Sequence, residues 1–369
     1  MDNCVIPHGY KATALGIIPQ EWEVMLLGNL SNSISSGRNK HRDAHGQYPV
    51  FGSTGIIGYS STYEYEGPVI LVARVGANAG TLNFASGQYD VSDNTLIITI
   101  KQNVYDYNFA YNQLTHYKLN KLVFGSGQPL ITSKQLKNIR IPIPPLAEQR
   151  KIAEVLGVWD KAIEKQARLI EKLALRKRAL MQRLLSAKLR LPGFSEPWKK
   201  VKLGDVAELY QPQTIQSEDL SQTGYPVYGA NGLIGYYNNY NHEYPQVVIT
   251  CRGSSCGTVN FTPGKCWITG NAMVLNVDNN RDVNKSFFYY LISNSSFVNL
   301  ISGSGQPQIV RQPLLKFELR IPPLKEQTAI AEVLTAADRE IDLAKEKLER
   351  LRRQKRGLMQ QLLTGKKRI

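Results

Sequence analysis

The chain contains the same unit twice. Residues 143–156 return as residues 321–334, with Pro-Pro-Leu, Glu-Gln and Val-Leu at matching places, and the Gly-Ser-Gly-Gln-Pro of residues 125–129 returns at residues 303–307. The offset is 178 residues in both pairs. Solenoid repeats have units of about 20 to 50 residues, so a unit of this size is a domain. The 369-residue chain is therefore expected to form two similar domains, and its function to need both copies.

Each copy ends in a segment with the pattern of a long helix. Residues 146–187 have no proline and a single glycine, and apolar side chains recur there at alternating steps of three and four. The second copy repeats the pattern from Ile330 onward, and Lys177 and Lys355 interrupt the two apolar seams at the same place. Heptad spacing predicts two long helices that pair through their seams. Apolar side chains outside the seams indicate further buried faces: Leu175, Met181, Leu185, Met359 and Leu363.

The remaining segments are rich in glycine, tyrosine and asparagine and contain short β-rich runs. Strands are predicted at residues 69–73, 95–100, 247–250 and 272–277. Short helices are predicted around residues 108–114, 133–137, 286–293 and 312–316.

The sequence therefore predicts an α+β fold in which two mostly β domains, related by a pseudo-twofold axis, are joined by two long helices that form an antiparallel coiled coil. The predicted boundaries are 1–145 for the first domain, 146–190 for the first helix, 191–323 for the second domain and 324–369 for the second helix.

The positive charge is concentrated in the two helical segments. Of the formal net charge of +15, residues 146–190 supply 12 Lys/Arg against 5 Asp/Glu, and residues 324–369 supply 12 against 7. Residues 1–145 (11 against 9) and 191–323 (10 against 9) are nearly neutral. A strongly basic chain favours an anionic partner such as nucleic acid. Solvent-exposed helix faces explain part of this excess of charged residues, but they do not explain why the net charge is positive in both copies.

Motifs of familiar catalytic sites are absent from the sequence. It has no GxxxxGK[ST] phosphate loop, no dinucleotide-binding GxGxxG unit and no nucleophile elbow, and its five histidines have no duplicated counterparts. We therefore expect a chain that is not an enzyme. No run approaches the roughly 18 uncharged apolar residues of a membrane span, and residues 1–10 lack a signal pattern, so we expect a cytoplasmic protein.

Three cysteines and a histidine in the second copy suggest a zinc site. They are Cys251, Cys256, Cys266 and His242. The corresponding first-copy residues, Ala73, Ala79 and Tyr89, carry no thiol, so that domain folds without a metal. We therefore expect reduced thiols and no metal site.

Several motifs closely resemble the specificity subunits of Type I restriction-modification systems. They are the Pro-Pro-Leu-x-Glu-Gln followed by Ile-Ala-x-Val-Leu, the Lys-Arg-x-Leu-Met-Gln-x-Leu-Leu from Lys177 and from Lys355, the domain openings at residues 20–22 and 196–198, and a late Leu-Thr-Gly-Lys. The resemblance covers essentially the full length. It implies two target-recognition domains, each reading one half of a bipartite DNA sequence, with the helices as a ruler between them.

The resemblance also implies partners. These are double-stranded DNA, two adenine-methylating modification subunits that bind S-adenosylmethionine, and optionally two restriction subunits that use ATP and Mg²⁺. The chain itself is expected to hold no cofactor. Two alternatives stay open: a specificity module for a methyltransferase or nuclease outside Type I, and an assembly scaffold that does not read DNA.

The isolated chain is expected to bind DNA weakly. Nearly neutral recognition domains cannot rely on bulk electrostatics, so affinity should come from placed contacts and from partner subunits. A binding titration of the purified chain at physiological salt checks this expectation. Tight, sequence-specific binding without modification subunits would contradict it.

Candidate DNA contacts that both copies share follow a strand or lie in a repeated loop. Arg74 and Arg252 come directly after equivalent apolar strands; they contact phosphate or bases, or they form structural salt bridges. Gln128 and Gln306 belong to the two Gly-Ser-Gly-Gln-Pro loops, whose amides could cradle a phosphate or serve only as a turn.

Positions at which the copies differ are the candidates for sequence reading. The first copy has the basic residues 38–42 where the second has the uncharged Gln211 to Thr214 segment with Gln213. These side chains suit guanine or adenine edges. A flexible basic loop is the alternative. The first-copy candidates are Arg38, Asn39, Lys40 and Arg42.

Overall fold

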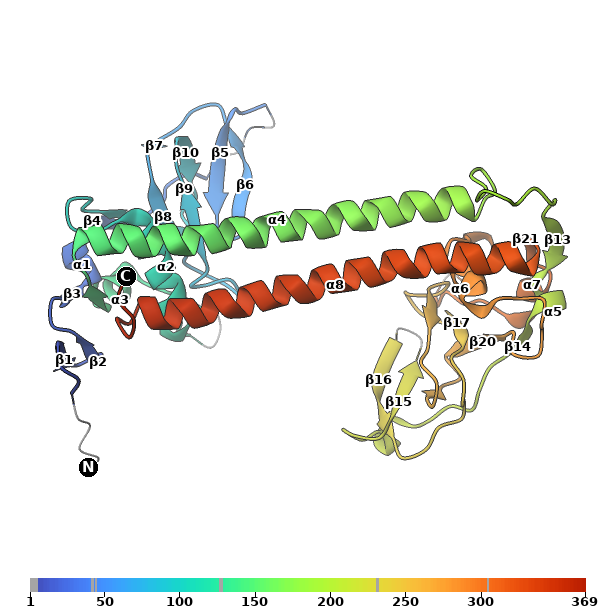
Figure 1. The fold of residues 1–369 in the computed structure, drawn as a ribbon. Helices are drawn as coiled ribbons and strands as arrows, with labels where there is room; N and C mark the ends of the chain where they lie inside the picture. Colours follow the sequence, from blue (N-terminus) through green and yellow to red (C-terminus); the bar gives the residue numbers. More distant parts are fainter. Residues whose placement is uncertain (1–5, 41–42, 44, 126–128, 230–231, 304) are drawn as a thin grey trace. The chain divides into compact units, whose positions relative to one another are not determined.

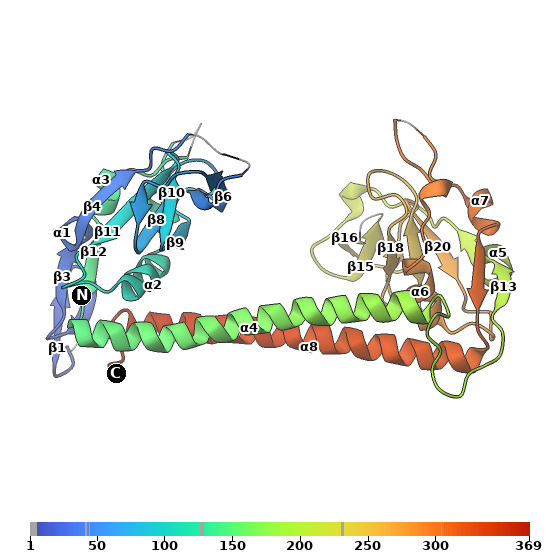
Figure 2. The same ribbon diagram turned by 90° about the horizontal axis from the view of Figure 1, so that it is seen from above.

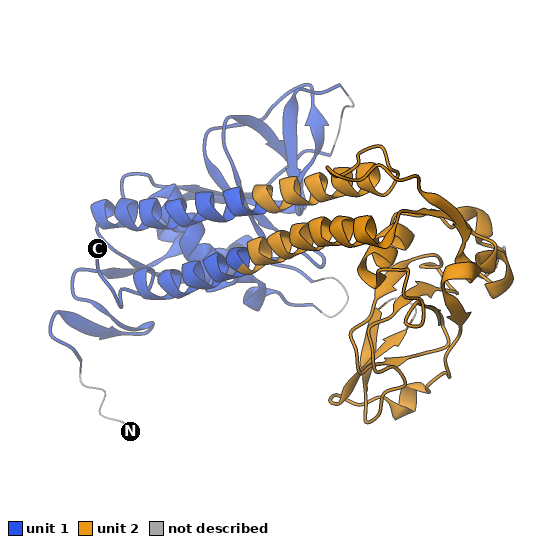
Figure 3. Ribbon diagram, turned by 45° about the vertical axis from the view of Figure 1, so that its right-hand side comes forward, with its two compact units in different colours: residues 1–167, 347–369 blue, residues 168–346 orange. Residues whose placement is uncertain are grey.

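The chain forms two compact units (Figure 3). A computed structural model describes residues 6–40, 43, 45–125, 129–229, 232–303 and 305–369. Unit 1 comprises residues 1–167 and 347–369, and unit 2 comprises residues 168–346. Each unit holds one of the β-rich copies together with parts of both long helices. Unit 1 is consequently assembled from an early and a late segment of the chain.

Unit 1 is built on an antiparallel four-stranded sheet with the strand order β4-β11-β8-β9 (Figure 1). A second sheet has the order β6-β5-β10-β7, with β5 and β10 parallel, and β1-β2 and β12-β3 form two-stranded ribbons. The strands are β1 (Tyr10–Thr13), β2 (Gly16–Pro19), β3 (Glu23–Leu26), β4 (Ser31–Ser36), β5 (Tyr48–Gly52), β6 (Gly55–Ser60), β7 (Tyr65–Glu66), β8 (Val69–Ala73), β9 (Leu82–Ala85), β10 (Gln88–Val91), β11 (Thr95–Ile100) and β12 (Arg140–Ile143). The short helices are α1 (Leu27–Leu30), α2 (Tyr107–Tyr117), η1 (Leu119–Leu122) and α3 (Ser133–Lys137).

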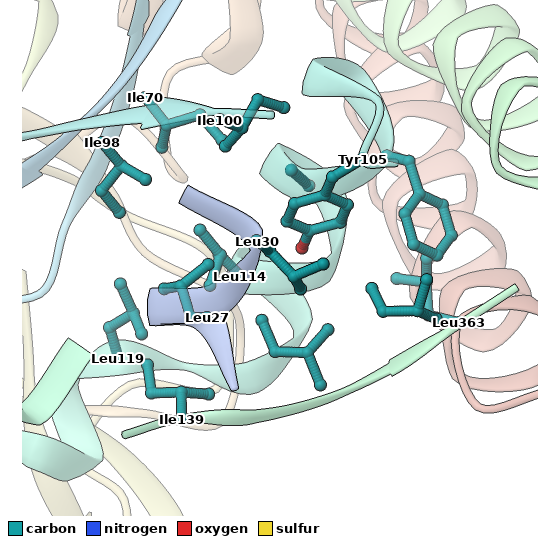
Figure 4. Packing of buried hydrophobic residues seen from close by; sticks show 14 of the residues in the cluster. Leu27, Leu30, Ile70, Ile98, Ile100, Tyr105, Leu114, Leu119, Ile139 and Leu363 are labelled. Atoms are coloured by element: carbon teal, nitrogen blue, oxygen red, sulfur yellow. The ribbon is translucent and has the colours of Figure 1, made fainter. Parts of the chain in front are cut away.

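The central strand β8 is apolar at every position because both of its faces are covered. Ile70 and Val72 belong to the larger core, whereas Val69 and Leu71 point into a smaller cluster on the opposite face. Helix α2 lies between the main sheet and the long helix α4 (Figure 2). The main sheet, α2, the start of α4 and the end of α8 contribute side chains to one hydrophobic cluster. Figure 4 shows part of this cluster, including Leu363, which follows α8.

Unit 2 repeats this plan. Its main sheet has the order β14-β20-β17-β18, its second sheet has the order β16-β15-β19 with β15 and β19 parallel, and β13-β21 forms a ribbon. The strands are β13 (Lys199–Lys202), β14 (Glu208–Tyr210), β15 (Tyr225–Gly229), β16 (Gly232–Tyr237), β17 (Val247–Thr250), β18 (Val259–Phe261), β19 (Trp267–Ile268), β20 (Ala272–Asn276) and β21 (Glu318–Ile321). The short helices are α5 (Leu203–Val206), η2 (Ser217–Asp219), α6 (Lys285–Ser293), η3 (Val298–Leu300) and α7 (Arg311–Leu315).

The two long helices are α4 (Leu146–Leu184) and α8 (Leu324–Leu362), with 39 residues each. Each spans about 58 Å at a rise of about 1.5 Å per residue. Helix α4 starts in unit 1 and ends in unit 2, and α8 does the reverse, so the two run antiparallel where they pack together. The predicted α+β fold and helix pair are confirmed.

The first long helix ends at Leu184, before residue 190, where the segment predicted for it ends. Ala187 adopts a left-handed conformation with φ of 57°, and its amide bonds to the Leu184 carbonyl at 3.2 Å. Gly365 occupies the equivalent place after α8 with φ of 72°. Helix composition alone did not show this stop, because in the first copy an alanine takes the conformation that usually marks a glycine.

Side chains outside the seams mostly complete the domain cores. Met359 and Leu363 belong to the core of unit 1, and Leu185 to that of unit 2. Leu175 differs, since it is 64% exposed. The prediction of more than one buried face is therefore correct for these helix ends.

The lysines that interrupt the seams form ion pairs between the helices. In unit 2, Lys177 pairs with Asp338 of α8; in unit 1, Lys355 pairs with Asp160 of α4 at 2.6 Å. The lysine side chains are only 19% and 14% exposed. Partly buried charges favour the one helix register that pairs them, which explains why both copies keep a lysine in an apolar seam.

The Glu-Gln of the repeated motif fastens each long helix to its domain. Buried Gln149 accepts a bond from the Asp106 amide at 2.8 Å and donates to the Val104 and Pro144 carbonyls, both at 2.9 Å. Gln327 makes the same three bonds in unit 2, to the backbone of Asn284, Asp282 and Pro322. The glutamine thus satisfies buried backbone groups of the turn before α2 or α6.

The preceding glutamate binds an arginine that follows the opposite helix. In unit 1, Arg368 Nε donates to Glu148 Oε1 at 2.6 Å, and Trp22 Nε1 donates to Glu148 Oε2 at 3.1 Å. In unit 2, Arg190 donates to both oxygens of Glu326, at 2.6 and 2.8 Å. We call these two contacts the clasps; each ties the start of one long helix to the end of the other.

Candidate nucleic-acid interface

Arg74 lies at one end of the main sheet of unit 1. It follows β8, and its Nη1 donates to Ser36 Oγ, at the end of β4, at 3.2 Å. The Arg74 backbone is fixed as well, because its amide bonds to the Asn94 carbonyl and its carbonyl accepts from the Ile131 amide, both at 2.9 Å. The start of β11, the end of β4 and the segment after the Gly-Ser-Gly-Gln loop therefore meet around this arginine.

The segment of Arg38, Asn39 and Lys40 leaves β4 at the same end of the sheet. The amides of Arg38 and Asn39 both donate to the Val91 carbonyl, at 3.0 and 2.9 Å. A Cβ on Gly37 would lie 2.4 Å from the carbonyl oxygens of both Val91, which ends β10, and Ser92, so only glycine permits this close approach. The chain is thereby held in one path that displays the next side chains.

The three displayed side chains differ in their freedom. Arg38 is 81% exposed and lies 3.6 Å from Glu64. Lys40 is exposed. The Asn39 amide donates to the buried carboxylate of Asp90, so that nitrogen is already engaged within the fold.

The predicted equivalence of Arg74 and Arg252 is wrong by one residue. The Cys251 amide bonds to the Asn271 carbonyl and the Cys251 carbonyl accepts from the Ile309 amide, so Cys251 is the counterpart of Arg74, and Arg252 is the counterpart of Val75.

The exposed Arg252 follows β17, and its backbone forms an isolated β-bridge with Gln308. The amide of the next residue, Gly253, bonds to the Pro307 carbonyl at 3.0 Å. Gln306, in the same loop, is exposed. Gln211 continues from β14 and donates to the Gly270 carbonyl at 3.0 Å.

Strand register makes Gln213 the structural counterpart of Arg38. Ile34 of β4 pairs with Ile98, and Leu209 of β14 pairs with Leu275, the residue equivalent to Ile98. Arg38 and Gln213 each follow that pair by four residues, and both side chains are exposed. The sequence offset of 178 does not align them, because unit 2 has additional residues between β14 and β15 and between β20 and α6.

Among the described residues, no carboxylate lies within ion-pair distance of Arg74 or Arg252. The structural salt bridge therefore gains no support from the described part of the chain. Two further predicted contacts, Arg42 and Gln128, lie outside the described residues.

Sequence reasoning missed two hairpins with exposed apolar tips. Ile56, the second residue of β6, is 54% exposed, and Leu233 at the equivalent place in β16 is 51% exposed. Gly55 and Gly232 begin the return strands with φ of 98° and 103°. The signal was present, as Gly-Ile-Ile-Gly and Gly-Leu-Ile-Gly recur at a step of 177.

The cysteines of unit 2 are packed into its fold. Burial raises the pKa of the Cys251 thiol to about 11 and also raises the pKa of Cys266. Both ring nitrogens of His242 are engaged, with Tyr210 Oη at 3.0 Å and Asn241 Oδ1 at 2.6 Å, and burial lowers the pKa of this imidazole. Among the described residues, no group of three or more His, Cys, Asp or Glu side chains could hold a metal ion.

No helix in the described part of the chain is long and apolar enough to cross a membrane.

Known proteins resemble the chain over nearly its whole length. It is 24% identical to the Type I restriction enzyme MjaVIII specificity subunit of Methanocaldococcus jannaschii, over 95% of this chain and 94% of that protein. It is 26% identical to the putative Type I restriction enzyme MjaX specificity subunit of the same organism, over 98% and 97%.

Solved structures share the fold. The S subunit of a Type I restriction-modification system from M. genitalium matches with a TM-score of 0.65 and 20% identity, over 93% of this chain and 96% of that one. A chain from a study of complex assembly and conformational transition in the Type I system matches with a TM-score of 0.57 and 19% identity, over 94% and 99%.

The family described as the Type I restriction modification DNA specificity domain matches twice, at residues 19–174 and 195–353. Both copies of the internal repeat are thus instances of one domain. The chain belongs to the specificity subunits of Type I restriction-modification systems.

Proposed function

We propose that each unit reads one half of a bipartite DNA sequence through the strand ends around Arg74 and Arg252. One observation carries this proposal: in both units the same end of the main sheet combines an arginine within two residues of a strand end, Arg74 after β8 or Arg252 after β17, with exposed side chains that differ between the copies. Shared groups can position DNA in either unit, whereas only differing groups can select different bases.

The side chains divide naturally between these two tasks. Arg74 and Arg252 suit phosphate contacts, and the exposed Gln306 precedes Pro307, whose carbonyl accepts from the Gly253 amide next to Arg252. Arg38 suits the O6 and N7 acceptors of guanine, and Gln213 suits adenine. Asn39, held by Asp90, positions its neighbours, while Lys40 supplies charge to the backbone. Arg42 and Gln128 stay predictions.

The chain recognises DNA and leaves the chemistry to partner subunits. Two modification subunits, one for each unit, would bring S-adenosylmethionine and methylate an adenine, and restriction subunits would bring ATP and Mg²⁺. Methylating an adenine requires a pocket for the flipped base and a methyl donor, which are features of the methyltransferase. The antiparallel helices would set the spacing of the half-sites and dock the modification subunits.

Exchanging the equivalent side chains tests this proposal. The Arg38→Gln variant and its mirror, Gln213→Arg, are each expressed with the modification subunits, and methylated adenines are mapped across the host genome. We expect a bipartite methylated motif for the unchanged chain. The Arg38 variant should alter bases in one half only, and the Gln213 variant bases in the other half only.

The possible outcomes separate the candidate functions. Methylation without a recurring bipartite motif would favour a scaffold that reads no DNA. An unchanged motif in both variants would exclude this segment as the reader. Loss of methylation without a change of motif would assign Arg38 to the DNA backbone.

A further inference from the structure

Unit 1 contains a cavity that its own side chains do not fill. The cavity has a volume of about 700 Å³ and lies between α2, β9 and the first turns of α4. Its lining includes Phe84, Tyr111, Asn112, Gly157 and Asp160.

In unit 2 a tyrosine occupies the equivalent space. Tyr290 of α6 stands at the place of Asn112, and it is 4% exposed. Its hydroxyl donates to Asp338 Oδ2 at 2.8 Å and lies 3.2 Å from Thr335 Oγ1. Lys177 Nζ lies 5.3 Å from the ring centroid. Asp338 and Thr335 correspond, at the offset of 178, to Asp160 and Gly157, which line the cavity of unit 1.

Two differences between the copies therefore open this space together. Unit 1 has Asn112 in place of the tyrosine, and the Asn112 amide donates to the Asn108 carbonyl of its own helix. It also has Gly157 in place of the threonine. A glycine inside a helix is unfavourable, and a Cβ at Gly157 would meet no atom of the described residues within 4 Å apart from the adjoining backbone of its own helix. Packing among the described residues thus gives no reason for this glycine.

The walls of the cavity suit an aromatic side chain. The rings of Phe84 and Tyr111 meet edge to face at 6.2 Å, and Phe84 is 39% exposed. Val158, on the adjoining turn of α4, is 63% exposed. Aromatic rings favour such edge and stacking contacts. In unit 2 the equivalent pair, Phe261 and Tyr289, lies beside Tyr290.

The charges of the cavity favour a protein over a nucleic acid. In a chain of net charge +15, this lining carries three carboxylates, from Asp106, Glu154 and Asp160, against two cations, from Arg150 and Lys161, and Lys355 pairs with Asp160 from α8. The site is therefore close to neutral and offers a DNA phosphate no surplus of positive charge. A phenol hydroxyl can instead donate to Asp160, as Tyr290 does to Asp338.

We propose that this cavity is a socket for a tyrosine side chain presented by a partner protein. Resting on the proposed function, the partner is the modification subunit. The tyrosine ring would lie between α2 and α4 and its hydroxyl would donate to Asp160. In unit 2, Tyr290 already fills the equivalent socket from within, so this mode of docking distinguishes the two units.

The test introduces into unit 1 the tyrosine and threonine that fill the equivalent space in unit 2. This full-length Asn112→Tyr, Gly157→Thr variant, which we call the plugged variant, is compared with the unchanged chain. The probe for a tyrosine side chain is p-cresol, and its binding is measured by ligand-observed NMR. We expect p-cresol to bind the unchanged chain and not the variant. Affinity for the modification subunit, measured by calorimetry, should fall about tenfold to a hundredfold, the effect of losing an aromatic anchor.

The Gly357→Ala variant is the matched control. Gly357 also lies inside a long helix and does not line the cavity. A Cβ added to it would meet no atom of the described part of the chain within 4 Å apart from the adjoining backbone of its own helix. This control should bind p-cresol and the modification subunit as the unchanged chain does.

Three outcomes would overturn the inference. They are failure of p-cresol to bind the unchanged chain, unaltered modification-subunit affinity in the plugged variant, and loss of DNA affinity in place of subunit affinity, which would assign the socket to a nucleobase. If the unchanged chain itself bound no modification subunit, the proposed function would fail, while the p-cresol result would still report on the socket.

Discussion

Replacing Glu326 by alanine is expected to lower the free energy of unfolding of unit 2 by about 3 kcal/mol. The Glu326 side chain is 1% exposed and receives two charge-assisted hydrogen bonds from Arg190. Its removal leaves a guanidinium without its carboxylate in a site where the arginine is only 26% exposed. That partial exposure places the effect at the lower end of the range for a broken buried pair.

Hydrogen exchange during urea unfolding measures this effect for each unit separately, which matters because a chain of two units need not unfold in one step. Glu148→Ala is the matched control in unit 1. Its partner Arg368 is 40% exposed and also pairs with Glu21 at 2.8 Å, so we expect a loss of about 1 to 2 kcal/mol. Equal effects in the two units would show that burial of the clasp is not what determines its strength.

Removing Arg74 and Arg252 together is expected to lower the DNA affinity of the assembled complex by about a hundredfold or more, since each contact contributes about 1 to 3 kcal/mol. Both arginines are held at strand ends, and neither has a carboxylate partner among the described residues. If both contact phosphate, the slope of log affinity against log salt should decrease by about two.

Binding titrations of the Arg74→Ala, Arg252→Ala complex over a range of salt concentrations check this prediction. The Arg140→Ala, Arg320→Ala complex is the control, because it loses the same charge from exposed positions on the β12 and β21 ribbons. A similar loss of affinity in both complexes would mean that only total charge matters. Altered base preference in the first complex would assign these arginines to base reading.

Much of the fold could be predicted because the two copies of the repeat give two independent sequences for most of its strands and helices. The strands at residues 69–73, 95–100 and 247–250 are confirmed, and the strand predicted at residues 272–277 ends one residue earlier, at Asn276. Fully apolar runs are easy to recognise as strands buried on both faces. The short strands of the second sheets were missed, because half-buried tyrosine and glycine segments carry little periodicity.

The roles of the repeated motif could not be predicted, because its partners are distant in sequence. The helix dipole explains why an acidic residue such as Glu148 is favourable in the first turn of a helix. It does not predict the ion pair of Glu148 with Arg368, because the two residues are 220 positions apart in the sequence. The same limit applies to the candidate interface. The repeat showed an arginine after each of the two strands, but the offset of 178 equated Arg252 with Arg74, whereas the strand register equates it with Val75. The contact of Arg74 with Ser36 depends on the strand order β4-β11-β8.

The composition of unit 1 also has a consequence for biosynthesis. Residues 168–346 emerge from the ribosome as one continuous stretch, so unit 2 can begin to fold before residues 347–369 have left the exit tunnel. Unit 1 must meanwhile persist without Met359, Leu362 and Leu363, which leaves part of its apolar core open to water. Unit 1, although it is synthesised first, would therefore complete its core last, and until then its apolar surface would be exposed to chaperones and proteases.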